Sequence, residues 1–168
     1  MVVYGVSAVV VFLVVVWLSG RGRTPAQVVA PRWWRLSGVM VWLSLLLGGF
    51  AGISQMVAPL VSGLAETPRQ VVSGAVLGGV VALVVRLGAG LALDADMGLF
   101  RWAVLFQVIA LGGDLLAAGS TGVRAWAALA VVPAFGLVCL AMAFRNPPRR
   151  PAPPEPARRP PARPPKRR

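Results

Sequence analysis

Long, unbroken apolar runs constrain this chain more than any other feature. The first is VVYGVSAVVVFLVVVWLS at residues 2–19, and four more follow at residues 36–64, 71–93, 98–119 and 123–144. A helix needs about 20 apolar residues to cross the hydrocarbon core of a bilayer. Because the runs do not alternate between apolar and polar residues, helices are expected rather than a β-barrel. The sequence therefore predicts an all-α integral membrane protein, a bundle of about five transmembrane helices.

Composition argues against a soluble domain. Of the 168 residues, 57% are hydrophobic and only 13% are charged, and the mean hydropathy is +0.75. In soluble domains, roughly a quarter of all residues are charged. Many of the charges in this chain lie in its last 24 residues, so little remains that would face water. The use of arginine rather than lysine, with much Ala, Gly, Val and Pro, is typical of GC-rich, actinobacterial-type genomes.

Two of the runs leave choices open. No positive charge precedes the first run and no small-x-small cleavage site follows it, so it is interpreted as a retained helix rather than a signal peptide. The second run is long and is expected to be tilted or kinked, since Pro59 removes a backbone donor near its end. A four-span variant, with one run lying in the membrane interface, is the alternative to five spans.

Basic residues set the expected orientation. Four arginines follow the first run, Arg101 follows the third, and nine basic residues lie in residues 145–168. Arg69 and Arg124 occupy the other two loops. An N-out, C-in arrangement places fourteen of these basic residues in the cytoplasm and two outside, as the positive-inside rule requires. The expected location is the cell (inner) membrane, with multiple passes.

Tryptophans support the span boundaries independently of the charges. Amphipathic indole rings prefer the interface between lipid and water. Tryptophans near the predicted span ends are Trp17, Trp33, Trp34, Trp102 and Trp126. We therefore expect these rings at the membrane surface.

Small residues at four-residue spacing are candidates for helix packing. Gly74, Gly78 and Ala82 form one ridge on the third run, and Gly48 and Gly52 form another on the second. In lipid, close backbone approach replaces the hydrophobic drive for helices to associate. We expect both ridges to lie in helix contacts, within one chain or in a homo-oligomer. The competing interpretation is that glycine is simply common here, with 19 in the chain.

Four polar residues lie inside the predicted spans. Arg86 continues the ridge of the third run and would either snorkel to the interface or bind an anion or lipid headgroup. Gln107 and Asp114 are seven residues apart and share a helix face. With Gln55 of the second run they would form a line through the bundle. That line would carry a proton or cation, or would serve interhelical hydrogen bonding.

Enzymatic activity is not expected. The chain has no histidine, the usual general base near neutral pH, and no recognisable catalytic or nucleotide-binding motif. Asp94 and Asp96 form a D-A-D pair in a loop, where solvation is the simpler interpretation than metal binding. The single cysteine, Cys139, is interpreted as a small buried residue. No cofactor and no metal is predicted.

The end of the chain, residues 145–168, is expected to be a disordered cytoplasmic tail. Residues 146–168 hold ten prolines and eight basic residues, which favours an extended polyproline II conformation. The candidate binding residues are Arg149, Arg150, Arg158, Arg159, Arg163, Lys166, Arg167 and Arg168. Three partners compete: anionic lipid, the phosphate backbone of nucleic acid, or a protein that recognises PxxP-like motifs such as PPARPPKR.

These features favour a non-enzymatic anchoring or assembly protein embedded in the lipid bilayer, whose basic tail engages anionic lipid, nucleic acid or a cytoplasmic partner. The alternative is a small transporter or holin-like pore that uses Arg86, Gln107 and Asp114. In layout, several short spans with a charged cytoplasmic tail, the chain resembles phage holins and the spread proteins of conjugative plasmids.

Overall fold

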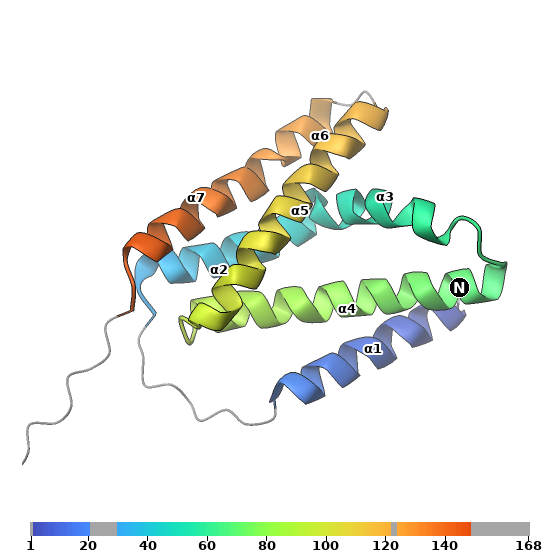
Figure 1. Cartoon of the computed structure of the whole chain (residues 1–168), viewed down its shortest axis with the longest axis horizontal. Helices are drawn as coiled ribbons and strands as arrows, with labels where there is room; N and C mark the ends of the chain where they lie inside the picture. Colours follow the sequence, from blue (N-terminus) through green and yellow to red (C-terminus); the bar gives the residue numbers. More distant parts are fainter. Residues whose placement is uncertain (1, 21–29, 122–123, 149–168) are drawn as a thin grey trace, which may run out of the picture.

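The computed structural model describes residues 2–20, 30–121 and 124–148, which form helices and contain no strand (Figure 1). The elements are α1 Val2–Gly20, α2 Arg32–Ser44, the π-helical turn η1 Leu45–Gly49, α3 Phe50–Val61, α4 Glu66–Ala92, α5 Met97–Thr121, α6 Arg124–Leu129 and α7 Val131–Arg145. The elements α2, η1 and α3 follow one another without a break, and Ala130 alone separates α6 from α7. The all-α class is confirmed.

Four helical segments are long and apolar enough to cross a membrane. They are Arg32–Val61, Glu66–Ala92, Met97–Thr121 and Arg124–Arg145. The apolar part of α1, Val2–Leu18, is shorter. Each long segment overlaps one of the predicted runs, although the helix of the second run begins four residues before residue 36 and ends three before residue 64. The predicted turn at Ser120 and Thr121 is part of α5, and Gly122 lies outside the described residues.

The bend in the second apolar run does not lie at Pro59, where it was expected. Pro59 lies inside α3, which continues to Val61. The non-helical backbone is at Gly48 in η1, with φ 173° and ψ −33°. A Cβ atom at Gly48 would lie 3.0 Å from Asp114 Oδ1 and 3.1 Å from a methyl carbon of Leu129. The helix is therefore reshaped where it packs against α5 and α6, and not where a backbone donor is missing.

Helices α1 and α4 lie side by side and run in the same direction (Figure 1). The small residues of α4 set their register. The backbone at Gly74 meets Tyr4 and Ser7, and the backbone at Gly78 meets Ala8. Both sets of numbers increase together, so the two helices are parallel.

The core lies between α2, α4, α5 and α7. Its largest fully buried side chain is Trp34, which was expected at the membrane surface. The Trp34 ring lies 5.6 Å from that of Phe100, which lies 5.9 Å from that of Phe144, between centroids. Trp34 Nε1 donates a 3.0 Å hydrogen bond to the backbone oxygen of Asn146. This bond satisfies the indole N–H inside the protein, so the ring does not need water.

A four-residue connection joins α4 to α5. Ala95 adopts a left-handed conformation there, with φ 49°, and the backbone N–H of Asp96 donates to the oxygen of Gly90 at 3.0 Å. Asp96 Oδ1 accepts from the backbone N–H groups of Gly98 at 2.7 Å and Leu99 at 3.4 Å. Asp96 therefore acts as the N-terminal cap of α5.

The helix ends gather at two sides of the molecule. The end of α1, the start of α2, the end of α4, the start of α5 and the end of α7 all lie toward the left of Figure 1. The start of α1, the α3–α4 connection and the end of α5 lie on the other side. Basic residues that begin or end helices on the left are Arg32, Arg35, Arg101 and Arg145, and those on the other side are Arg69 and Arg124.

Candidate functional site

Two buried polar side chains, Gln107 and Asp114, lie on the inner face of α5. Among the described residues, the buried polar side chains are Ser37, Ser44, Gln107 and Asp114. Ser37 bonds within its own helix, to the oxygen of Trp34. Gln107 and Asp114 share one face of α5, as the seven-residue spacing predicted. Both side chains face the bent helix formed by α2, η1 and α3, since they contact Ser44 and Gly48 respectively.

Gln107 joins three helices. Ser44 Oγ lies 2.7 Å from Gln107 Oε1 and 2.8 Å from the backbone oxygen of Met40. A hydroxyl carries one proton and cannot donate to both oxygens. Both contacts are satisfied when the amide is turned so that its nitrogen donates to Ser44, which then donates to Met40. On its other side the amide packs on α7, where a Cβ at Gly136 would lie 2.6 Å from Gln107 Nε2.

Asp114 is buried without a hydrogen-bond partner. Its side chain is 1% exposed, and neither carboxyl oxygen has a partner among the described residues. Its carboxyl lies against η1 at Gly48, and Leu129 of α6 closes in on the same point. An unpaired ionised carboxylate is very costly in such surroundings. The arrangement therefore accommodates a neutral, protonated carboxyl, or a carboxylate that has bound a cation.

The predicted polar line does not include Gln55. That side chain is exposed on α3. Gly52 of α3 does meet α5, where an added Cβ would lie 2.6 Å from the backbone nitrogen of Asp114. The structure thus brings Ser44 and Gln107 into contact, places Asp114 about two turns further along the same face of α5, and leaves Gln55 on the surface.

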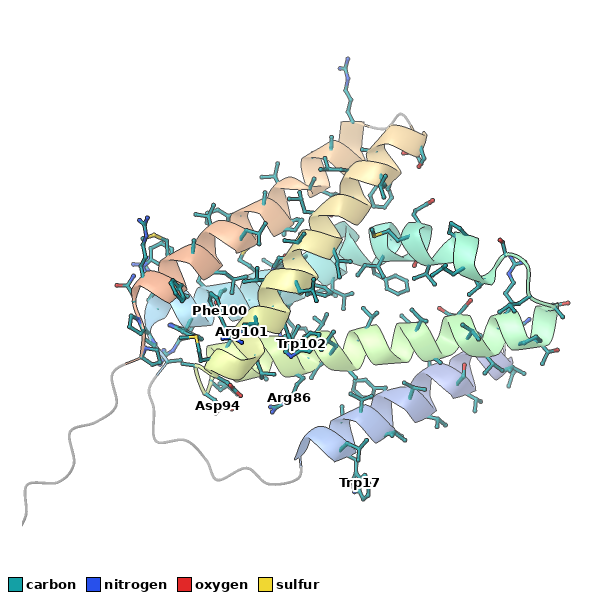
Figure 2. The ribbon with its side chains drawn as sticks, viewed as in Figure 1. Trp17, Arg86, Asp94, Phe100, Arg101 and Trp102 are labelled. Carbon is teal, nitrogen blue, oxygen red and sulfur yellow. The ribbon has the colours of Figure 1, made fainter. Side chains whose placement is uncertain are left out.

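Arg86 lies apart from the polar pair of α5. It leaves α4 on the side that faces α1, away from α5 (Figure 2). Its Nη1 atom is buried and has no hydrogen-bond partner among the described residues, although the side chain as a whole is half-buried. Because Gly74 and Gly78 meet α1 from the same ridge, Arg86 belongs to the α1–α4 contact.

The glycines of the small-residue ridges lie at contacts between helices. Gly74 and Gly78 contact α1, Ala82 is buried, and Gly48 and Gly52 contact α5.

Two further close contacts between helix backbones were not predicted from the sequence. A Cβ at Gly113 would lie 2.6 Å from the backbone carbon of Gly52, and a Cβ at Gly38 would lie 2.6 Å from the oxygen of Gly88. Each of these pairs joins two helices. No spacing within one helix reveals them.

Two predicted features have a simple placement. Cys139 is buried in α7. The tail residues Arg149, Arg150, Arg158, Arg159, Arg163, Lys166, Arg167 and Arg168 lie outside the described residues.

Comparison of the chain with protein-family models, curated proteins and solved structures finds no match.

Proposed function

We propose that this chain is a five-span membrane protein, N-out and C-in, that anchors a set of basic segments at the cytoplasmic face of the cell membrane. The observation that supports it is the segregation of helix ends. The ends next to the arginine-rich stretches all lie on one side of the molecule (Figure 1). A fold that mixed these ends would require arginines on both sides of the bilayer, against the positive-inside rule.

Helix α1 is the fifth span in this proposal, despite its shorter apolar stretch. It lies parallel to α4 in a register fixed by Gly74 and Gly78. Its 19 residues reach about 28 Å at ~1.5 Å per residue, close to the ~30 Å of the hydrocarbon core. Many of its large side chains are exposed, including Val6, Leu13 and Leu18, as lipid contact would favour. A helix lying flat in the interface would not pack lengthwise on α4.

The role that follows is non-enzymatic anchoring or assembly. The tail follows α7, and Asn146, which caps the end of α7, accepts the hydrogen bond from Trp34 of α2. Basic segments held together at one surface attract polyanions: anionic lipid contributes about 1 kcal/mol per basic residue, and nucleic acid binds through its phosphates. Of these partners we favour anionic lipid, since the proposed topology starts the tail at the membrane surface.

A deletion starting at Arg149 tests the role of the tail. It keeps Asn146 and so preserves the contact with Trp34, which a cut after Phe144 would remove. The intact and shortened proteins are compared for binding to anionic liposomes and to DNA across a salt series. We expect strong, salt-sensitive binding that is lost with the tail.

The matched control keeps every proline of the tail and replaces its basic residues by glutamine. Loss of binding in this variant assigns the effect to charge. Unchanged binding would assign it to the proline-rich backbone, and hence to a protein partner. Equal binding by the intact and shortened proteins would reduce the tail to a topology signal.

The second candidate function is proton or cation conduction through the bundle. One observation favours it: beside the π-helical turn, the buried carboxyl of Asp114 has no hydrogen-bond partner in the described part of the chain. Turns of this kind are frequent at functional sites. Ser44, Gln107 and Asp114 would carry the path, without Arg86 or Gln55.

A further inference from the structure

A pocket opens between α1, α3 and α4. Its volume is about 340 Å³, within the usual range for small-molecule sites. Apolar side chains of α3 and α4 form most of its walls: Phe50, Ile53, Val57, Val61, Val76 and Leu77. After the bend at η1, α3 runs toward the α3–α4 connection and lies apart from α4 on the way (Figure 1). The pocket is therefore an apolar cleft formed by the shape of the fold.

A polar hollow of about 500 Å³ adjoins this cleft at the start of α4. Tyr4, Arg69 and Ser73 line both spaces, so the two lie next to each other. Glu66 and Gln70 complete the hollow. The combined site is apolar along its length and charged at one end, which is the pattern of an amphiphile.

The hollow presents a cation and an anion separately. Arg69 and Glu66 are both exposed, and no ion pair joins them in the described part of the chain. Glu66 Oε1 instead accepts a 3.2 Å hydrogen bond from Gln70 Nε2. An arginine fork suits a phosphate group, and a carboxylate suits an ammonium group. A purely anionic headgroup would meet repulsion from Glu66.

The depth of the site fits one leaflet of a bilayer. Arg69 lies in the first turn of α4 and Leu77 lies eight residues further on, about 12 Å at ~1.5 Å per residue. Half of the hydrocarbon core is about 15 Å. An acyl chain beside Val76 and Leu77 would thus lie parallel to α4, with its headgroup at the level of Arg69.

We propose that this cleft binds an aminophospholipid of the outer leaflet, with the phosphate on Arg69, the ammonium on Glu66 and one acyl chain between α3 and α4. The inference depends on the membrane insertion proposed above. It assigns a specific lipid site on the side of the molecule opposite the basic segments.

Native mass spectrometry of the full-length protein in a neutral detergent tests this site. Phosphatidylethanolamine and phosphatidylglycerol with the same acyl chains are titrated separately. We expect phosphatidylethanolamine to bind about tenfold more tightly, the equivalent of one charge-assisted contact. Arg69→Gln should bind phosphatidylethanolamine about tenfold more weakly than the unchanged protein. Glu66→Gln should remove the preference between the two lipids while phosphate binding persists.

Arg124→Gln is the matched control. It removes the exposed arginine at the start of α6, on the same side of the molecule but outside the cleft, and should leave both affinities unchanged. Val76→Phe narrows the cleft and should weaken both lipids alike. Equal binding of the two lipids, or an Arg69→Gln protein that behaves like Arg124→Gln, overturns the site.

Alkaline extraction of cell membranes separates the two proposals. If the protein stays in the membrane but shows no lipid preference, the cleft proposal fails and the anchoring proposal stands. If alkali releases the protein, membrane insertion fails and the lipid site fails with it.

Discussion

Two buried residues of α5 differ at the scale of single atoms. Gln107 has a partner in Ser44, whereas both oxygens of Asp114 have none among the described residues. A neutral amide bonded across helices stabilises a bundle by about 1 kcal/mol or less. A buried carboxyl without a partner contributes no such bond, and its burial costs folding free energy. Asp114 is therefore the better candidate for a functional residue, and Gln107 for a structural one.

Asp114→Asn separates the two functions proposed for the chain. Asparagine keeps the size of the side chain and stays neutral, so we expect the melting temperature in detergent to change little. Proton or cation flux into proteoliposomes, followed with an internal dye, should be lost if Asp114 conducts. Asp96→Asn is the control, since asparagine caps a helix as well as aspartate. Flux equal to that of the unchanged protein would rule conduction through Asp114 out.

The sequence predicted part of this site at the residue scale. The seven-residue spacing of Gln107 and Asp114 indicated a shared face, because one helix fixes both directions. It could not predict that Gln55 is exposed or that Trp34 is buried. Those outcomes depend on how α3 and α7 pack against other helices, and depth in a membrane does not determine which way a side chain faces.

At the scale of helices, α3 and α5 approach closely through a pair of glycines. Gly113→Val should destabilise the protein by about 1–3 kcal/mol, since the added side chain would overlap the backbone of Gly52. Gly112→Val is the matched control, because nothing lies within 4 Å of a Cβ at that position. Thermal unfolding in detergent measures both. Equal losses for the two variants would show that the cost is intrinsic to the helix and not to the contact.

Helix boundaries and helix shape were predictable to different degrees. Continuous apolar runs identified four long helices to within a few residues, since length and hydropathy decide them. The π-helical turn at Leu45–Gly49 left no periodic signal, and Pro59 drew attention to the wrong place. The bend arises from the fit of Gly48 against Asp114 and Leu129, which is a property of three elements together.

At the scale of the whole molecule, the alternation of helix directions was easier to predict than which helices are neighbours. Successive apolar runs joined by short loops imply alternating directions, and the helix ends lie on two sides in that order (Figure 1). The N-out, C-in orientation stays a prediction. The packing of α1 on α4, two long helices later in the chain, could not be read from the sequence. It depends on a register between Gly74, Gly78 and the backbone of α1, and other glycines offered similar ridges.

Single cysteines test the orientation and the number of spans together. Cys139 is buried and is first replaced by alanine. Gly63→Cys between α3 and α4 should react with a membrane-impermeant maleimide in intact cells, whereas Met97→Cys at the start of α5 should react only after lysis.

Val2→Cys tests whether α1 is a fifth span. If α1 crosses the membrane beside α4, residue 2 lies outside and is labelled in intact cells. Labelling only after lysis would leave α1 on the cytoplasmic face, and a parallel contact with a spanning α4 would then be wrong.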